Sequence, residues 1–363
     1  MCRFLVYIGK EPVLLADLLT RPSHSIIQQS WDSRERMTAG PLNGDGFGVG
    51  WYAAFDPTPC IFTSINPAWN NLNLRRLADK VMSRLIFAHV RAASLGLLIN
   101  EANCHPFSFG PFIWMHNGQI VGFTSIKRKL VQYIDDQLFN HIQGTTDSEY
   151  SFMLFLQILF YGGKCRSDGS HASSVVDLEQ ILKAADDGDT TSSAEGETAK
   201  RFTADEMRQA MTKTVRLIAK WTSKTCTRAE RERSGYSLLN YAVSDGFTAV
   251  VTRFTDDPIG PPASLYYTSG TRYQAKKKGE YHLVQERRQE CFIIASEPLS
   301  VSEDDRRDWV PVPKNHCVVV TSQHNLLLYP INLAAPVKEP IGPSSDHQRL
   351  KPLNNQPGCR MGA

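Results

Sequence analysis

A cysteine stands directly after Met1, in the opening stretch MCRFLVYIGK. Most lone cysteines are small apolar residues without a catalytic role, and Cys2 can be one of them. Cys2 has a second possibility, because Met1 can be removed when the next side chain is small. The freed α-amine, with a pKa near ~7.7–8.0, would then lie beside a thiol with a pKa near ~8.5 and could accept its proton. Cys2 could therefore supply both nucleophile and base.

A thiolate that attacks an amide carbonyl needs hydrogen-bond donors for the oxyanion that develops. Asn117 and Gly118, in the stretch HNGQ, offer a side-chain amide and a backbone N–H next to each other. The same Asn-Gly pair joins two apolar runs in FIWMHNGQIVGF, a pattern that predicts the turn of a β-hairpin. The two interpretations are compatible, since a hairpin tip is a rigid place from which to present two donors.

Two charged residues could bind a substrate at both ends. Arg91 ends a predicted buried strand in FAHVRAAS, so its charge needs a partner. That partner is either a structural carboxylate or the carboxylate of a substrate, held through two parallel hydrogen bonds. Asp147 stands at the start of a predicted helix in TTDSE. It is either a simple N-cap or the acceptor for a substrate ammonium group.

The pair Cys104-His105 raises the question of a metal site. Adjacent residues on a strand point to opposite faces, and no second pair stands at metal-ligand spacing. The glycine-rich stretch NGDGFGVG matches neither phosphate-binding loop pattern. We therefore expect no metal and no cofactor.

The composition is that of a globular protein. The 363 residues are 42% hydrophobic and 21% charged, with a net charge of +3, which is too balanced to favour nucleic acid as a partner. No apolar run is long enough for a membrane span, and the start of the chain lacks the features of a signal peptide. Eight cysteines without a CxxC motif are typical of reduced thiols, which predicts a cytoplasmic protein.

The predicted elements that position these residues run from strands to long helices and back to strands. This order favours an α+β fold in which helices cover two antiparallel sheets, within one domain at 2–330. Polar low-complexity sequence predicts a largely disordered surface insertion at 166–200, and the segment 331–363 is expected to be an unstructured tail. Strands are predicted at 3–8, 46–52, 85–91 and repeatedly after about 236, and helices at 72–83, 124–143, 147–162 and 203–224, the last with Thr203 and Glu206 as a capping box.

Together these motifs resemble a known family. The initial MC, HVRAAS, NCHPF, HNGQI and TTDSE occur in the order seen in class II glutamine amidotransferases, which are N-terminal nucleophile hydrolases. The stretches RPSHSIIQQSWDSR, LNGDGFGVGWY, PAWNNLNL and IIASEPL further resemble the amidotransferase-like subunits of fungal glutathione-degradation complexes. The resemblance covers 2–160 strongly and 203–330 more loosely. It implies a four-layer αββα sandwich of two antiparallel sheets between helices.

The resemblance also implies roles for single residues. Cys2 would be the nucleophile after loss of Met1, and Asn117 and Gly118 would form the oxyanion hole. Arg91 would hold the substrate α-carboxylate and Asp147 the α-ammonium. The border of the site would include Ser94 and His105.

Departures from the family pattern concern the rim of the pocket. Ala92 follows the arginine where tryptophan is common, Ser94 replaces a threonine, and the stretch LGLLINEA is long. These differences leave room for a γ-glutamyl substrate larger than glutamine.

These implications lead to three functional hypotheses. The first is a γ-glutamyl amide hydrolase that works through a cysteine thioester and releases glutamate and Cys-Gly from glutathione, in a complex with a peptidase-like protein partner. The second is a glutaminase that supplies ammonia to a partner synthase. The third is a catalytically silent scaffold subunit. No nucleotide or phosphate motif follows residue 200, so an acceptor activity would belong to a partner.

Overall fold

A computed structural model describes residues 1–35, 42–93, 99–162, 202–285 and 288–333. The predicted insertion at 166–200 and nearly all of the predicted tail at 331–363 lie outside these residues. The extent of the domain, 2–330, therefore remains a prediction.

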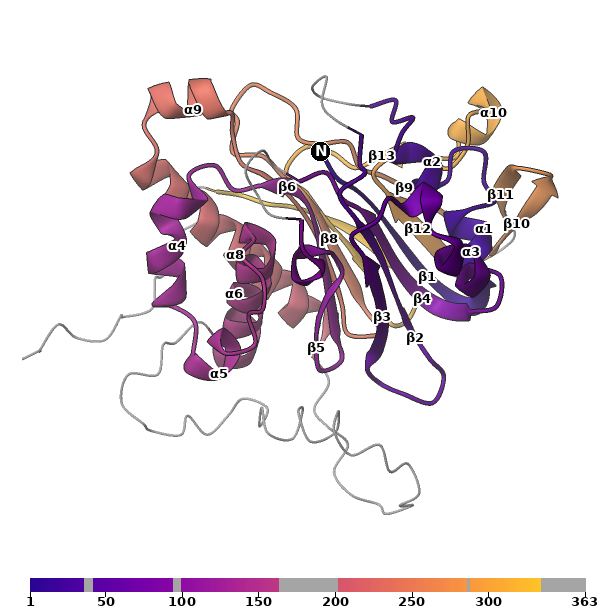
Figure 1. Cartoon of the computed structure of the whole chain (residues 1–363), viewed down its shortest axis with the longest axis horizontal. Coiled ribbons are helices and arrows are strands. Elements are labelled where there is room, and N and C mark those ends of the chain that lie inside the picture. The colour runs from indigo at the N-terminus through magenta and orange to yellow at the C-terminus, as the bar shows by residue number, and fades with distance from the viewer. Residues whose placement is uncertain (36–41, 94–98, 163–201, 286–287, 334–363) are drawn as a thin grey trace, which may run out of the picture.

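The described chain forms four layers, with two antiparallel sheets face to face and helices on both outer sides (Figure 1). This confirms the α+β, αββα architecture. The first sheet has the order β13-β9-β12-β1-β4-β2-β3, and the second has the order β15-β14-β8-β7-β6-β5. The first contains β1 Arg3–Leu14, β2 Phe47–Tyr52, β3 Pro59–Ser64, β4 Met82–Val90, β9 Tyr266–Gly270, β12 Cys291–Ala295 and β13 Val310–Pro311. The second contains β5 Phe107–Phe109, β6 Phe112–Gln119, β7 Leu238–Ser244, β8 Ala249–Arg253, β14 His316–Val320 and β15 Leu326–Pro330.

The helices fall into two groups, one for each outer face (Figure 1). The helices beside the first sheet are all short, and those beside the second include the two longest of the described helices. A separate hairpin, β10 Arg272–Lys277 with β11 Glu280–Val284, stands beside the first group. The first group is α1 Leu15–Leu19, α2 Ile26–Gln29, α3 Leu72–Ala78 and α10 Glu303–Arg306, and the second is α4 Phe123–Val131, α5 Asp136–Phe139, α6 Asp147–Tyr161, α8 Ala204–Thr225 and α9 Arg228–Ser234.

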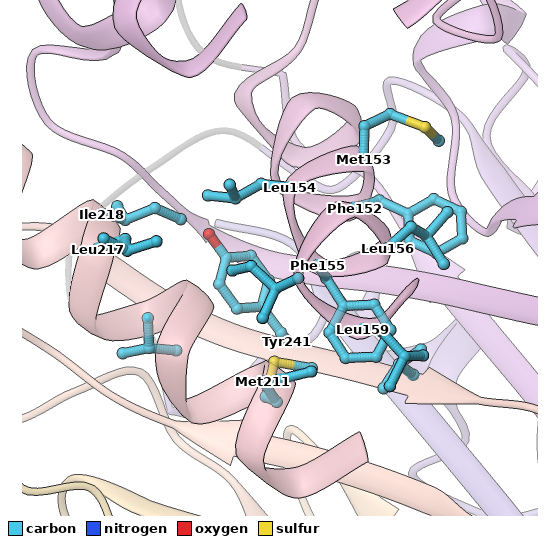
Figure 2. Close-up of a cluster of buried hydrophobic side chains, with 14 of the residues drawn as sticks. Phe152, Met153, Leu154, Phe155, Leu156, Leu159, Met211, Leu217, Ile218 and Tyr241 are labelled. Carbon is cyan, nitrogen blue, oxygen red and sulfur yellow. The ribbon is translucent and has the colours of Figure 1, made fainter. Parts of the chain in front are cut away.

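Helix α6 is the centre of the larger outer layer. Its side chains are apolar on nearly all sides, and they pack both on the second sheet and on α8 (Figure 2). The hydroxyl of Tyr241 on β7 donates to Ser151 at 3.0 Å, which satisfies the one polar atom that this ring brings into the core. The helix ends at Gly162, whose φ of 59° is the left-handed conformation that glycine adopts without strain. The predicted end at Gly162 is confirmed.

Two other helix predictions had different outcomes. Thr203 and Glu206 form the predicted capping box at the start of α8. The helix predicted at 124–143 is instead divided into α4 and α5. Asp135 causes the division, because its side chain caps α5 at the backbone N–H of Gln137 while its own N–H donates to Gln157 on α6.

Side chains on the strands alternate between the two sides of each sheet. On β1, Phe4 and Val6 point into the layer between the sheets, whereas Leu5 and Tyr7 point toward the short helices. The same alternation places Cys2 on the inner side of the first sheet and Arg3 on its outer side. Cys2 therefore faces the layer between the two sheets, whereas Arg3 faces the short helices.

Candidate active site

The described candidates for the site lie where the ends of several elements come together. β1 begins beside the end of β4, since Arg3 pairs with Val90, and beside the end of β12, since Leu5 pairs with Ala295. β6 of the opposite sheet ends at the same place, where Asn117 contacts Ser296, and α6 begins there, where Asp147 contacts Ile120. Five elements from distant parts of the chain therefore deliver their terminal residues to one edge of the sandwich.

Cys2 lies against the backbone that follows β4. The N–H of Ala92 points at its Sγ at 3.3 Å, and Sγ lies 3.6 Å from the carbonyl oxygen of the same residue. The thiol is partly exposed. Because Arg3 pairs with Val90, Cys2 lies opposite Arg91, the residue directly after β4, so the nucleophile candidate and the guanidinium candidate are neighbours.

Arg91 is only 3% exposed, yet its side chain makes few hydrogen bonds with the described residues. Nη1 lies 3.5 Å from the carbonyl oxygen of Asp45, and the carboxylate of Asp45 accepts from the N–H of Ala93 instead. No carboxylate of the described residues lies within ion-pair distance of Arg91. The structural ion pair considered from the sequence is thus absent from the described part of the chain. A buried guanidinium that has no carboxylate partner can bind an anionic ligand.

Asn117 and Gly118 do not form a hairpin tip, so that prediction was wrong. β6 runs straight through both residues, and they pair with Asn240 and Leu239 on β7. Continuous pairing with a central strand outweighs the local turn preference of Asn-Gly. Gly118 is required at its position because a Cβ there would collide with the carbonyl oxygen of Leu238.

The side chain of Asn117 is completely buried between the sheets. Its Nδ2 donates to Oγ of Ser296 at 3.2 Å, and its Oδ1 has no hydrogen-bond partner among the described residues. Nδ2 carries two hydrogens, so one N–H stays available after Ser296 has taken the other.

Asp147 is the first residue of α6 and not its N-cap, so the N-cap interpretation was wrong. The cap is Thr146, whose side chain accepts from the N–H of Glu149. The partly exposed carboxylate of Asp147 accepts from the N–H of Ile120 at 2.7 Å, which ties the start of α6 to the end of β6. Asp147 thereby contacts the residue directly after the strand that carries Asn117 and Gly118.

Three buried histidines underlie the site. His89 and His105 lie with ring centroids 4.2 Å apart, and the Nε2 of His89 donates to the carbonyl oxygen of His116 at 3.1 Å. Burial lowers the pKa of His89 to about 3 and also lowers the pKa values of His105 and His116. All three are therefore neutral at physiological pH. Both ring nitrogens of His105 lack a partner among the described residues.

Sequence reasoning missed a buried ionic cluster on the outer side of the first sheet. Glu297, directly after β12, accepts from Arg3 Nε at 2.8 Å and from His24 Nε2 at 2.9 Å. It also accepts from the Ser33 hydroxyl and from the N–H groups of Arg34 and Glu35. The guanidinium of Arg3 in turn donates to the carbonyl oxygen of Cys2 at 2.9 Å.

A signal for this cluster was present in the sequence. Arg3 is a charge inside a predicted strand, and Glu297 directly follows the apolar run CFIIAS. Charges in such positions are buried only when they are paired. Ser296 lies in the stretch IIASEPL, which carries part of the family resemblance but indicates no role for this residue.

Ser94 lies outside the described residues. The described residues contain no group of His, Cys, Asp and Glu side chains arranged to hold a metal ion. In the ranges that the structure covers, no helix has both the length and the apolar character to cross a bilayer.

Comparisons with known proteins agree with this arrangement. Residues 15–217 match the family model of class II glutamine amidotransferases. The chain is 41% identical over 337 residues to the probable glutamine amidotransferase DUG3 of Saccharomyces cerevisiae, covering 91% of this chain and 84% of that protein.

Two further comparisons are more distant. Over 120 residues the chain is 32% identical to the gamma-glutamyl-hercynylcysteine sulfoxide hydrolase of Mycolicibacterium smegmatis, covering 33% of this chain and 52% of that protein. The solved structure of a glutamine aminotransferase class-II domain protein from Silicibacter pomeroyi superimposes with a TM-score of 0.53 at 22% identity. That likeness covers 91% of this chain and all of the solved one, and it shows a shared fold.

Proposed function

Because this chain belongs to the class II glutamine amidotransferases, we propose that it hydrolyses a γ-glutamyl amide bond through a thioester on Cys2. The observation that carries the proposal is Arg91, a buried guanidinium beside Cys2 with no carboxylate partner among the described residues. The α-carboxylate of a γ-glutamyl group supplies the missing charge. Asp147 receives the α-ammonium of the same group, and the two contacts fix its carbonyl relative to Cys2.

The reaction begins when Cys2 is the first residue of the chain. While Met1 is present the nitrogen of Cys2 belongs to a peptide bond and cannot act as a base. Once freed, the α-amine takes the thiol proton, and Sγ attacks the γ-glutamyl carbonyl. One N–H of Asn117 Nδ2 and the backbone N–H of Gly118 stabilise the oxyanion of the tetrahedral intermediate.

The second half of the reaction restores the thiol. The protonated α-amine of Cys2 gives its proton to the leaving nitrogen. The C–N bond breaks, and the γ-glutamyl group remains on Sγ of Cys2 as a thioester. Water, deprotonated by the same amine, attacks the thioester and releases glutamate. The histidines beneath the site are neutral and add no positive charge that would compete with Arg91 for the substrate.

Glutathione is the substrate that we propose. Its γ-glutamyl bond to cysteine is the side-chain amide of glutamine with a substituent on nitrogen, so the same head group fits Arg91 and Asp147. Ala92, where the family commonly has tryptophan, leaves space for the larger leaving group. The products would be glutamate and Cys-Gly, and a peptidase-like partner that consumes Cys-Gly would form a complex with this chain in the cytoplasm.

The test compares hydrolysis of glutathione and of glutamine by protein whose loss of Met1 has been verified by intact mass. We expect glutathione to be preferred and the Cys2→Ala variant to be inactive. A glutamine-like electrophile should add one label to the wild type and none to the variant. A preference for glutamine would support the glutaminase alternative, whereas a fully active Cys2→Ala variant would refute the thioester mechanism.

A further inference from the structure

Ser296 connects the two sheets at the proposed oxyanion site. It follows the last residue of β12, and like Phe292 and Ile294 on that strand it points into the layer between the sheets. The side chain is completely buried. Its Oγ lies 3.2 Å from Nδ2 of Asn117, which belongs to the opposite sheet.

The same residue is bound twice to the strand that carries the nucleophile. The backbone N–H of Phe4 donates to Oγ of Ser296 at 3.0 Å, and the N–H of Ser296 donates to the carbonyl oxygen of Phe4 at 3.0 Å. Phe4 is two residues after Cys2 and, by strand alternation, points to the same side of the sheet. Oγ of Ser296 thus accepts from the nucleophile strand and from the oxyanion donor at once.

We propose that Ser296 is a positioning residue that sets the carboxamide of Asn117 at a fixed distance and orientation relative to Cys2. This inference rests on the proposed function. The second N–H of Asn117 can serve the oxyanion only if the carboxamide does not rotate, because rotation would present Oδ1, an acceptor, to a negatively charged oxygen. No other described residue bonds to this carboxamide. Ser296 is therefore its only hydrogen-bond partner among the described residues.

Loss of the hydrogen bond from Asn117 to Ser296 should raise the free energy of the transition state rather than that of the bound substrate. The oxyanion exists only during catalysis, so a misplaced Asn117 lowers kcat while the contacts of Arg91 and Asp147 with the substrate persist. Loss of one oxyanion donor lowers kcat by roughly 10²–10³. Loss of its restraint should lower kcat by a smaller factor, about tenfold to hundredfold, because the correct orientation is still visited.

The experiment compares Ser296→Ala, Ser296→Thr and the control Ser83→Ala. Ser83 is another buried residue, on β4, whose hydroxyl bonds to the carbonyl oxygens of Tyr52 and Leu85 and to no residue of the site. Turnover of a chromogenic γ-glutamyl anilide gives kcat and KM, and alkylation by iodoacetamide gives the reactivity of the Cys2 thiol. Alkylation forms no oxyanion, so it reports the nucleophile without the oxyanion site.

We expect Ser296→Ala to lower kcat about tenfold to hundredfold with KM and the alkylation rate nearly unchanged. Ser296→Thr keeps the hydroxyl and should recover most of kcat, and Ser83→Ala should resemble the wild type. The inference is overturned if Ser296→Ala retains the kcat of the control, or if its alkylation rate falls in parallel with kcat, since that would mean a displaced strand. A wild type inactive on every γ-glutamyl substrate would instead refute the proposed function, and this inference with it.

Discussion

Replacing Glu297 by glutamine keeps the shape of the side chain but removes its charge, and we expect this change to destabilise the protein strongly. Glu297 and Arg3 are each 1% exposed, and Oε1 lies 2.8 Å from Nε. Removing one member of a buried ion pair leaves the other charge without compensation, which costs about 3–5 kcal/mol. Glutamine also places an NH₂ group where one carboxylate oxygen accepts hydrogen bonds, so part of the cluster around Ser33 and Arg34 loses its acceptor.

The chain provides a matched control at the other end of the same strand. Glu290 directly precedes β12 and pairs with Lys10 at 3.1 Å, but the two side chains are 25% and 57% exposed. Glu290→Gln should change the free energy of unfolding by only about 0–1 kcal/mol, because water screens an exposed pair. Equilibrium unfolding in urea at pH 7, followed by tryptophan fluorescence, measures both variants against the wild type.

The dependence on pH supplies a second criterion. Burial alone would raise the pKa of Glu297, but the hydrogen bond from His24 and the charge of Arg3 outweigh it and hold this pKa well below its usual range. A carboxyl whose pKa is lower in the folded state stabilises the protein above its unfolded pKa of about 4.3, and this contribution is lost as the pH falls further. The difference between wild type and Glu297→Gln should therefore be constant from pH 6 to 8 and shrink below about pH 4. A Glu297→Gln protein as stable as Glu290→Gln, or a difference that does not shrink in acid, would refute this reasoning.

Four further predictions concern the site and the layers around it. Arg91→Lys should raise KM for γ-glutamyl substrates and lower kcat/KM roughly tenfold to hundredfold, because the lysine ammonium cannot hold a carboxylate through two parallel N–H bonds as a guanidinium does. Steady-state kinetics measure the change, with Arg84→Lys on the exposed side of β4 as the control. Asp147→Asn should raise KM more than it lowers kcat, because the amide oxygen can still accept from Ile120 but no longer attracts an ammonium; an unchanged KM would remove Asp147 from the substrate site. Gly118→Ala should abolish activity and lower the melting temperature, because its Cβ would collide with Leu238. Gly162→Ala, whose Cβ would meet no described atom within 4 Å beyond its own helix and chain neighbours, should cost only about 1–2 kcal/mol for its left-handed backbone. Acid should destabilise the protein below about pH 6.5, because the unfolded chain protonates His89, His105 and His116 at a pH where burial lowers the pKa of all three in the folded chain. His89, with a pKa of about 3 in the folded chain, contributes about 1.4 kcal/mol per pH unit between the two values; equal urea midpoints at pH 5 and pH 7 would contradict the neutral state of these rings.

The elements that could be predicted from the sequence are those whose local signals agree with their packing. The capping box of α8 and the glycine end of α6 are both formed as expected. The periodicity of the predicted helix at 124–143 was informative even where the helix was not continuous. Ile126, Leu130, Ile134 and Leu138 are all buried, although Asp135 divides the segment into two helices.

What could not be predicted depends on contacts between distant parts of the chain. Asn117-Gly118 has the local signature of a turn, and only pairing with β7, more than a hundred residues later, keeps it extended. The absence of an ion pair at Arg91 among the described residues is likewise a fact of three-dimensional arrangement. Ser296 and Glu297 point to opposite sides of one sheet, and no local pattern indicates that each binds the start of the chain.

The contact between Arg3 and Glu297 spans 294 residues, which has a consequence for how the protein is made. At roughly 5–20 residues per second, a ribosome needs about 15–60 s after synthesis of Arg3 to add Glu297. During that interval the start of the nascent chain is open to an aminopeptidase, but β12 does not yet exist to hold β1 in place. Removal of Met1, which the proposed mechanism needs, therefore has time to precede the contact between Arg3 and Glu297.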